Sequence, residues 1–358
     1  MRRFACGCCF ISLSGVLLPL LVVRWLVLTD IQGPLRYENV TSEREAFVRE
    51  VYAELNFRRQ HGVFRDRLDD VASVAELNSD PLPEALHPNV PQQDLCSSPK
   101  FCAASLTEMK ATFAISARRK LTACLAPKSM STVMSAILCF LERPAEFVAA
   151  GRSLLLERND IRFCGAVNIF DSKGGIRQKL KIDEKTMESE WKTIAVFRDP
   201  VDRFLSGFVQ RCVQLRKSDC GGCRYNMTCF LEYQLQRAIQ HSHVAEISLN
   251  EEDLHFFPQR WFCPLDENIS YLKYSADPKI SLISQIEAVL KERGVEPEWI
   301  SYVSESLSSD RTAHSTYNSA VRQFLEKRIK SSPYLLELLT RLTYPDYAII
   351  NSLKSDSG

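Results

Sequence analysis

Two short stretches of the sequence combine cationic and hydroxyl side chains where a predicted strand gives way to a helix. The first is PKSMST, which supplies one ammonium, three hydroxyls and a run of backbone N–H groups. Free N–H groups and the dipole at a helix N-terminus favour negative charge, and phosphate suits such a turn. The candidate phosphate-binding residues of this turn are Pro127, Lys128, Ser129, Ser131 and Thr132.

The second stretch is VFRDPVDRFLSGF. Asp199 can cap the helix that follows, and Pro200 fits its first position. Arg198 at the strand end and Ser206 on the helix can converge on one anion. Arg203 is expected to be an outer contact or a solvated side chain. Each stretch alone is also typical of a capped surface turn, so their occurrence together, each after a buried strand, indicates the ligand site.

Hydrophobic patterning predicts the elements that position these stretches. Apolar runs predict buried strands at 121–126, 193–197 and 269–275, and helical spacing is found at 279–294. VMSAILCFL, SAVRQFLEKRIK and PYLLELLTRL predict further helices. Alternating strands and helices predict an α/β fold, a P-loop-like parallel sheet flanked by helices. Ligands bind beyond the carboxyl ends of such strands, where both stretches lie.

The glycines exclude two common nucleotide-binding loops. A nucleoside triphosphatase loop needs glycines before its lysine, and the chain has none between Gly62 and Gly151. No GxGxxG fingerprint of a dinucleotide site occurs either. Phosphates are therefore expected to be held by a short turn and side chains. The formal net charge of +1 gives no reason to expect nucleic acid as a partner.

Together, PKSMST and RDPVDRFLSGF resemble the two nucleotide-binding signatures of Golgi carbohydrate sulfotransferases, especially the chondroitin-type group and its nematode members. The resemblance covers roughly residues 120–350, including DLHFFPQRWFC and a closing YPDY. It implies 3′-phosphoadenosine 5′-phosphosulfate (PAPS) as the sulfate donor. It also implies a 5′-phosphosulfate site at Pro127, Lys128, Ser129, Ser131 and Thr132, and a 3′-phosphate site at Arg198 and Ser206.

One position departs from the family pattern. Many sulfotransferases have glycine or another small residue where Met130 stands, and methionine does not readily take a positive φ. Either the turn uses ordinary dihedrals or nucleotide binding is impaired. The second alternative leaves open a catalytically inactive, lumenal nucleotide- or glycan-binding protein of the same fold.

Sulfuryl transfer from a phosphate oxygen to an acceptor hydroxyl needs a cation at the leaving phosphate and a base at the hydroxyl. Lys128 is the candidate cation. Of the six histidines we expect His255 to be the base, because it lies in an aromatic stretch where a sugar can stack. A core or surface histidine is the alternative reading of His255, and Asp253 is the alternative base. No metal is expected.

The N-terminus predicts a membrane anchor. Phe4 to Val23 is a run of 20 residues without a formal charge, about the length that spans a bilayer. No good cleavage site follows it, and Arg2 and Arg3 favour a cytosolic N-terminus. We expect a cytosolic tail at 1–3, a signal-anchor transmembrane helix at 4–28, a stem at 29–95 and a lumenal sulfotransferase domain at 96–358.

Sequons support a lumenal body, since N-glycosylation triplets begin at Asn39, Asn226 and Asn268. We therefore expect a single-pass type II protein of the Golgi membrane that transfers sulfate from PAPS to a glycan hydroxyl. A chondroitin-like glycosaminoglycan on a proteoglycan is the acceptor that the resemblance implies.

The cysteines agree, because ten of the 13 lie beyond the predicted anchor. An oxidising lumen favours disulfides. Cys124 and Cys139, in apolar surroundings, are expected to be buried free thiols. One group has the spacing of a metal cluster but is better explained by disulfides, and its members are Cys212, Cys220, Cys223 and Cys229.

Overall fold

The computed structural model describes the body of the chain, at residues 95–96, 101–105, 109–158, 160–215, 220–243, 247–263, 268–274, 281–309 and 319–355. The predicted tail, anchor and nearly all of the stem lie outside these residues, as does Asn39. No helix within the described ranges is long and apolar enough to cross a membrane.

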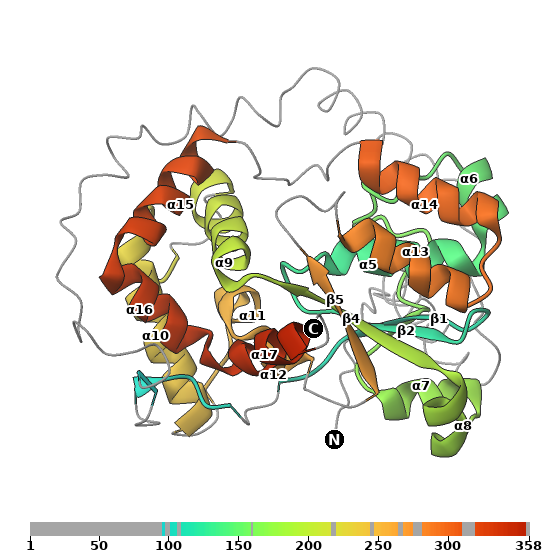
Figure 1. Cartoon of the computed structure of the whole chain (residues 1–358), viewed down its shortest axis with the longest axis horizontal. Helices are drawn as coiled ribbons and strands as arrows, with labels where there is room; N and C mark the ends of the chain where they lie inside the picture. Colours follow the sequence, from blue (N-terminus) through green and yellow to red (C-terminus); the bar gives the residue numbers. More distant parts are fainter. Residues whose placement is uncertain are drawn as a thin grey trace, which may run out of the picture.

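A five-stranded sheet with the order β3-β1-β2-β4-β5 forms the centre of the fold (Figure 1). The three strands predicted from the sequence are β2, β4 and β5, and they pair in parallel. The strands are β1 (Phe113–Ser116), β2 (Leu121–Cys124), β3 (Ile169–Phe170), β4 (Lys192–Arg198) and β5 (Ile269–Tyr274).

The prediction of a wholly parallel sheet is wrong at one edge. β1 pairs with both β2 and β3 in antiparallel register, so the sheet is mixed. The cause is local, because only the short turn 117–120 joins β1 to β2, and a turn of that length allows only a hairpin.

Side-chain alternation along β4 divides the core between the two faces of the sheet. Ile194 and Val196 pack with α5 (Ser131–Glu142), α13 (Leu282–Glu292) and α14 (Pro297–Ser309). Ala195 points to the other face. The helices of that face include α7 (Lys173–Leu180), α9 (Pro200–Phe208), α10 (Met227–His243), α15 (Ala320–Ser331) and α16 (Pro333–Leu342).

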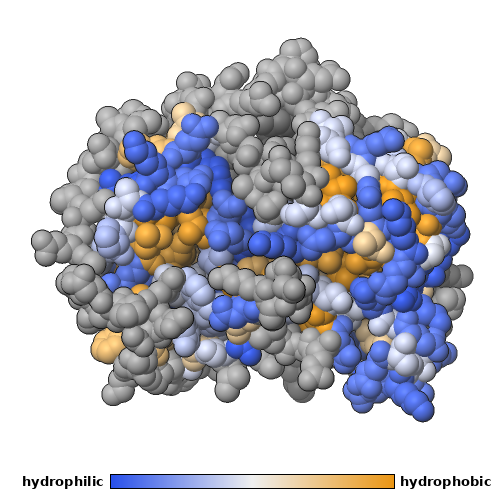
Figure 2. Space-filling view, viewed as in Figure 1, coloured by the Kyte–Doolittle hydropathy of each residue, from blue (hydrophilic) through white to orange (hydrophobic). Residues whose placement is uncertain are grey.

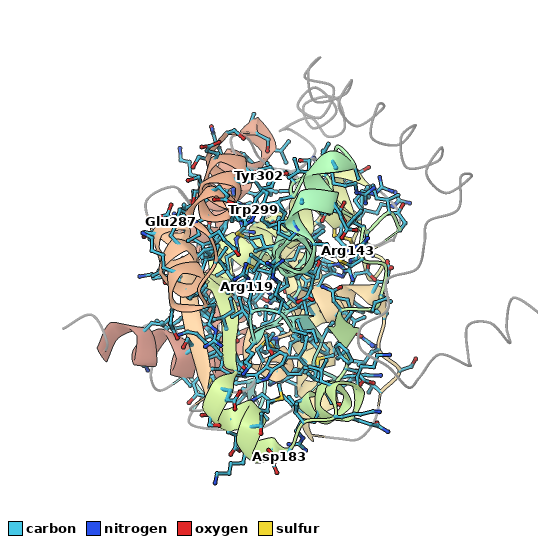
Figure 3. The ribbon with its side chains drawn as sticks, turned by 90° about the vertical axis from the view of Figure 1, so that its right-hand side faces the viewer. Arg119, Arg143, Asp183, Glu287, Trp299 and Tyr302 are labelled. Carbon is cyan, nitrogen blue, oxygen red and sulfur yellow. A yellow bond between two sulfur atoms is a disulfide. The ribbon has the colours of Figure 1, made fainter. Side chains whose placement is uncertain are left out.

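Helix α5, which follows the first stretch, is fixed by aromatic packing. Phe140 stacks on Tyr302 with ring centroids 4.8 Å apart and meets Trp299 edge-on at 5.7 Å. Figure 3 shows Trp299 and Tyr302 together on α14. The helices predicted at 133–141, 279–294, 319–330 and 333–342 are present, in α5, α13, α15 and α16.

Shorter helical segments complete the described fold. They are α6 (Pro144–Ala149), α8 (Glu184–Glu190), the π-helix η2 (Val209–Gln214), α11 (Glu251–Phe256), α12 (Gln259–Phe262), the 3₁₀ helix η3 (Tyr344–Asp346) and α17 (Tyr347–Ser355).

Disulfides link cysteines of the described body. The prediction of disulfides in the Cys212 to Cys229 group is confirmed, whereas the prediction of free thiols at Cys124 and Cys139 is wrong. Folding brings each of these two buried thiols to a distant partner that local sequence does not reveal. The pairs are Cys96–Cys102, Cys124–Cys263, Cys139–Cys164, Cys212–Cys220 and Cys223–Cys229.

Candidate active site

The PKSMST stretch forms a tight turn between β2 and α5. Lys128 has φ 65° and Met130 has φ 58°, both in the left-handed region. The interpretation that the turn uses ordinary dihedrals is therefore wrong. Met130 adopts the backbone shape that a glycine takes easily, at a cost of about 1–2 kcal/mol. Its half-buried side chain packs against the core around α5, which offsets this cost.

The N-terminus of α5 is left open. No side chain caps it, and no acidic residue occupies its first turn. The N-cap residue, Met130, therefore provides no side-chain acceptor for the first backbone N–H groups of this helix of 12 residues. Ser131 is half-buried and Thr132 is exposed at this end, whereas Ser129 is buried and its hydroxyl donates to Gln259 Oε1 at 2.5 Å. The arrangement suits an anion in front of α5.

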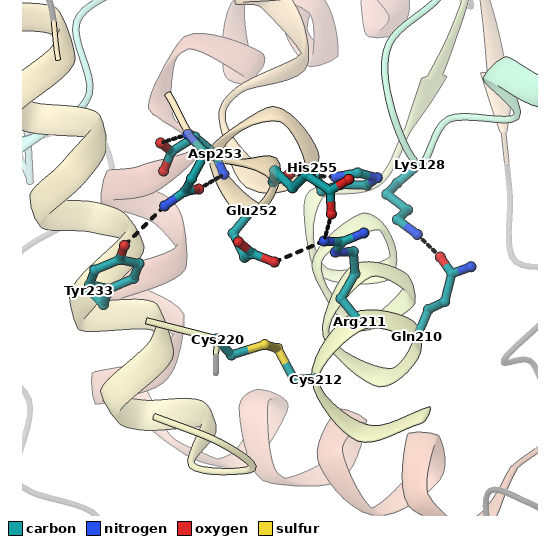
Figure 4. A network of polar contacts seen from close by, with 11 residues as sticks. Lys128, Gln210, Arg211, Cys212, Cys220, Tyr233, Glu252, Asp253 and His255 are labelled. Carbon is teal, nitrogen blue, oxygen red and sulfur yellow. Dashed lines mark hydrogen bonds and ion pairs between the residues drawn. A yellow bond between two sulfur atoms is a disulfide. The ribbon is translucent and has the colours of Figure 1, made fainter. Parts of the chain in front are cut away.

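Lys128 lies within a cluster of guanidinium groups. Burial, together with the charges of Arg211, Arg198 and Arg203, lowers the pKa of Lys128 to about 7. Its Nζ donates a hydrogen bond to Gln210 Oε1 (Figure 4). Positive charges that are held together in this way favour a negatively charged ligand.

Arg198 connects the two stretches, as the sequence suggested it could. It ends β4, and its Nη1 donates to the Lys128 carbonyl oxygen at 3.2 Å. Its guanidinium carbon lies 4.8 Å from the centre of the Tyr274 ring, which fixes its plane. Ser206 lies half-buried on α9.

The start of α9 follows the prediction. Asp199 Oδ1 accepts a hydrogen bond from Asp202 N, and Pro200 is the first helical residue. Arg322 of α15 also reaches this end, donating to Asp202 Oδ1 at 2.6 Å. Burial is the main cause that lowers the pKa of Arg198, and the charge of Arg322 acts in the same direction. Sequence reasoning missed Arg322, because its segment showed only the spacing of a helix.

Arg203 is a buried clamp, so its expected role as an outer contact or solvated side chain is wrong. It is only 2% exposed. Its Nε donates to Pro127 O at 2.9 Å and its Nη1 donates to Phe257 O at 2.8 Å. Carbonyl groups of two irregular segments need buried donors, and a guanidinium supplies both. Arg203 thereby ties the Lys128 turn to α9.

Gln259 is a second buried connection that sequence reasoning missed. Its amide binds both backbone groups of Arg198, accepting from Arg198 N at 3.0 Å and donating to Arg198 O at 2.8 Å. The same amide donates to the fully buried Asp346 at 3.4 Å. The DLHFFPQRWFC and YPDY segments therefore support the two strand ends.

The structure brings His255 to the cation cluster. Its Nδ1 lies 2.6 Å from Glu251 O, and because a carbonyl only accepts, Nδ1 carries the proton and Nε2 is the basic nitrogen. Burial and the charge of Lys128 are the main causes that lower the pKa of His255 to about 4.

Asp253, the alternative base, is occupied structurally. It is fully buried, and its side chain accepts from the backbone N–H of Asn250 in the capping box of α11 (Figure 4). It also pairs with Arg237. Its carboxylate oxygens are thus engaged by several donors, which makes it a structural residue.

The two described sequon asparagines differ in setting. Asn268 is exposed beside β5, whereas Asn226 is half-buried and its Oδ1 accepts from Cys229 N at 2.9 Å. Within the described ranges, no group of three or more His, Cys, Asp or Glu side chains could hold a metal ion.

Buried guanidinium N–H groups without a hydrogen-bond partner indicate whether an anionic nucleotide fits the site. Several buried guanidinium N–H groups have no hydrogen-bond partner within the described part of the chain. Such donors are costly unless a ligand or water binds them. The atoms are Arg198 Nε, Arg203 Nη2, Arg211 Nε and Arg322 Nη1. On the face shown in Figure 2, hydrophilic side chains also run across the centre, between apolar areas.

The uncapped N-terminus of α5 and the cationic cluster lie at the carboxyl ends of the parallel strands β2 and β4 of this α/β fold, an arrangement that suits a polyanionic ligand. Residues 111–350 match the family described as "Sulfotransferase family". The chain belongs to this sulfotransferase family, whose members generally use PAPS as the sulfate donor.

Three Caenorhabditis elegans proteins are similar over most of their length. Carbohydrate sulfotransferase chst-1 is 31% identical over 250 residues, which cover 67% of this chain and 74% of the relative. The protein vep-2, provisionally named a sulfotransferase, is 31% identical over 73% of this chain and 83% of its own. The protein C18B2.2 is 29% identical over 72% of this chain and 74% of its own. No solved structure matches the chain significantly.

Proposed function

We propose that this sulfotransferase is a PAPS-dependent carbohydrate O-sulfotransferase. The observation that carries the proposal is the meeting of Lys128, at the open N-terminus of α5, with Arg198 from the end of β4. The similarity to a relative named carbohydrate sulfotransferase supports a glycan acceptor. A chondroitin-like chain on a proteoglycan is the acceptor class that we propose to test first.

The residues present fit the donor. The turn of Pro127, Lys128, Ser129, Ser131 and Thr132 and the first N–H groups of α5 are suited to the 5′-phosphosulfate. Arg198, with Ser206, is suited to the 3′-phosphate. Arg322, whose Nη1 has no hydrogen-bond partner among the described residues, contacts the same end of α9.

Each catalytic group has one task. The bound donor supplies the sulfuryl group. His255 Nε2 accepts the proton of the acceptor hydroxyl as its oxygen bonds to sulfur. Lys128 Nζ neutralises the charge that the phosphate retains when its bond to sulfur breaks. Arg203 and Gln259 do not take part in bond changes; they hold the Lys128 turn against Arg198.

The direct test is transfer of labelled sulfate from PAPS to a panel of desulfated glycans by the full-length chain. Label on a glycan supports the enzyme, and loss of label transfer in Lys128→Ala links it to this site. Saturable PAPS binding without transfer to any glycan would instead support the catalytically inactive binding protein of the same fold.

For location we propose a single-pass type II protein of the Golgi membrane, with residues 4–28 as anchor, 29–95 as stem and 96–358 in the lumen. The uncharged run at the N-terminus and the sequons at Asn39, Asn226 and Asn268 support it. Glycosidase should lower the mass of membrane-inserted protein, and protease outside sealed vesicles should spare nearly the whole chain. Digestion of the body under these conditions would contradict the proposed orientation.

A further inference from the structure

The chain departs from α-helical geometry immediately after α9. In η2 (Val209–Gln214) the backbone N–H of Leu215 donates to Gln210 O at 3.0 Å, a bond five residues back along the chain. Such π turns are uncommon and are frequently found at functional sites, since the wider turn redirects side chains. Here two consecutive side chains, Gln210 and Arg211, reach separate parts of the candidate site.

Gln210 contacts the candidate catalytic cation. Its Oε1 accepts the hydrogen bond from Lys128 Nζ (Figure 4). An amide oxygen fixes the direction of an ammonium without cancelling its charge. A carboxylate in this place would form an ion pair with Lys128 and repel the phosphates that the site is suited to bind. Neutral glutamine therefore suits a lysine that must remain available to an anion.

Arg211 contacts the helix that carries the candidate base. It binds the carboxylates of Glu251 and Glu252 at the start of α11, the second with a distance of 3.0 Å. The Glu251 carbonyl oxygen in turn accepts from His255 Nδ1. Arg211 thus holds the segment that sets the tautomer and direction of His255.

The π turn itself is firmly attached. Cys212 is bonded to Cys220, and Val209 and Val213 are fully buried. Close packing brings α9 against α11, because a Cβ on Gly207 would lie 2.7 Å from the Phe256 ring. Side chains that project from a fixed turn lose little entropy when they hold their partners.

We propose that the π turn 209–214 positions both groups of the transfer step, with Gln210 orienting Lys128 and Arg211 fixing the helix of His255. Both are positioning residues, since neither touches the reacting atoms. The roles of Lys128 and His255 rest on the proposed function, whereas the contacts do not depend on it.

The first test measures the pKa of Lys128 by the pH dependence of its acylation, read by mass spectrometry of the full-length chain. The wild-type midpoint is expected at about 7. Gln210→Ala removes the acceptor and should lower it, while Gln210→Glu adds a negative charge and should raise it. Gln214→Ala, on the same π turn, is the matched control and should leave it unchanged. Unchanged midpoints in both Gln210 variants would overturn the proposal.

The second test follows α11 by hydrogen exchange and His255 by exchange of its ring C2 proton. Arg211→Met should speed amide exchange in α11 and raise the pKa of His255, because a neighbouring positive charge is lost. Arg211→Lys keeps the positive charge but lacks the planar guanidinium that binds two carboxylates. Amide exchange in α11 should therefore become faster, while the pKa of His255 stays near the wild-type value. Wild-type exchange of α11 in both variants would overturn the role of Arg211.

Turnover separates this proposal from the proposed function. With labelled PAPS and an acceptor glycan, Gln210→Ala should lower kcat roughly 10- to 100-fold, as expected for a displaced catalytic group, with a smaller change in KM for PAPS. If the wild-type chain sulfates no glycan but the Lys128 midpoints shift as expected, the proposed function fails and the positioning of Lys128 stands. Normal kcat in Gln210→Ala, in an active enzyme, would overturn the positioning role.

Discussion

Lys128 and His255 lie close enough for the charge of the lysine to lower the pKa of the histidine, although one follows β2 and the other lies on α11. Burial is the largest cause of the lowered pKa of each, to about 7 for Lys128 and about 4 for His255. Between these values the lysine is charged and the imidazole is neutral. That pair of states is the one that sulfuryl transfer requires of a cation and a base.

The pH dependence of kcat/KM should report this pair. It should rise as pH increases through about 4, when His255 becomes neutral, and fall through about 7, when Lys128 loses its proton. Negative charge on the bound donor raises both pKa values, so both limbs of the kcat profile should move to higher pH. Initial rates across both limbs measure this. An alkaline limb that persists unchanged in Lys128→Arg would exclude Lys128 as its origin.

Lys128→Met should lower activity and raise stability. Turnover should fall on the order of 10²–10³-fold with the loss of one electrostatic contact, while resistance to urea should increase because a buried charge is removed. The folded pKa lies below the unfolded value of 10.5, so the wild-type chain gains stability as pH rises from about 7 to 10.5. The advantage of the variant should therefore be largest below about pH 7.

The matched control is Lys291→Met on α13, where the lysine is exposed. It should change neither turnover nor, by more than about 0.5 kcal/mol, the stability. A Lys128→Met protein that is destabilised at every pH would contradict the view that the ammonium is an uncompensated charge.

Arg198 should distinguish PAPS from the analogue that lacks the 3′-phosphate. A charge-assisted contact contributes about 1.5–3 kcal/mol, so Arg198→Ala should weaken PAPS binding at least roughly tenfold. Binding of adenosine 5′-phosphosulfate should change much less. Arg198→Lys should recover only part of the affinity, because an ammonium lacks the planar fork and stacks poorly on Tyr274. Equal losses for both nucleotides, measured by calorimetry, would exclude Arg198 from recognition of the 3′-phosphate.

Local signals predicted the parts of the fold and site that are encoded locally. Strand-length apolar runs and helical periodicity predicted β2, β4 and β5 and the helices α5, α13, α15 and α16. They did not predict α10 or α14, the two longest helices of the described residues. The PKSMST and RDP stretches, each after an apolar run of strand length, correctly predicted that Lys128 and Arg198 lie at the ends of neighbouring strands. The antiparallel strands β1 and β3 were missed, and β3, at the edge of the sheet, is only two residues long.

The supporting residues could not be predicted because their roles arise from tertiary contacts. Arg203 and Gln259 bind backbone groups of distant segments, and no spacing in the sequence marks a side chain for such a role. The free-thiol prediction for Cys124 failed for the same reason, since its partner Cys263 is 139 positions away. Arg203, which was expected to be an outer contact or solvated, and Gln259, in a segment noted only for its aromatic residues, instead hold the candidate site together.

Gln259 should be energetically coupled to Asp346. Gln259→Glu keeps the shape but replaces the amide donor by oxygen, facing Arg198 O at 2.8 Å and the buried Asp346 carboxylate. The variant should lose about 1–3 kcal/mol of stability, because buried acceptors then face each other. Asp346→Asn in the Gln259→Glu background restores a donor opposite the new carboxylate, so the double variant should be more stable than the sum of the single losses predicts, by about 0.5–3 kcal/mol.

Urea unfolding of the wild type, the two single variants and the double variant measures this coupling. Gln285 provides a control for the contacts that Gln259 makes with the backbone. Gln285 makes the same pair of backbone hydrogen bonds to a strand residue in a solvent-exposed position. It accepts from Lys273 N at 3.0 Å and donates to Lys273 O at 3.2 Å. Because water can replace these exposed bonds, Gln285→Glu should change stability by less than about 0.5 kcal/mol. Losses that simply add in the Gln259 and Asp346 cycle would show that Asp346 acts elsewhere. Coupling, together with weaker PAPS binding in Gln259→Glu, would show that the YPDY segment supports the donor site through this glutamine.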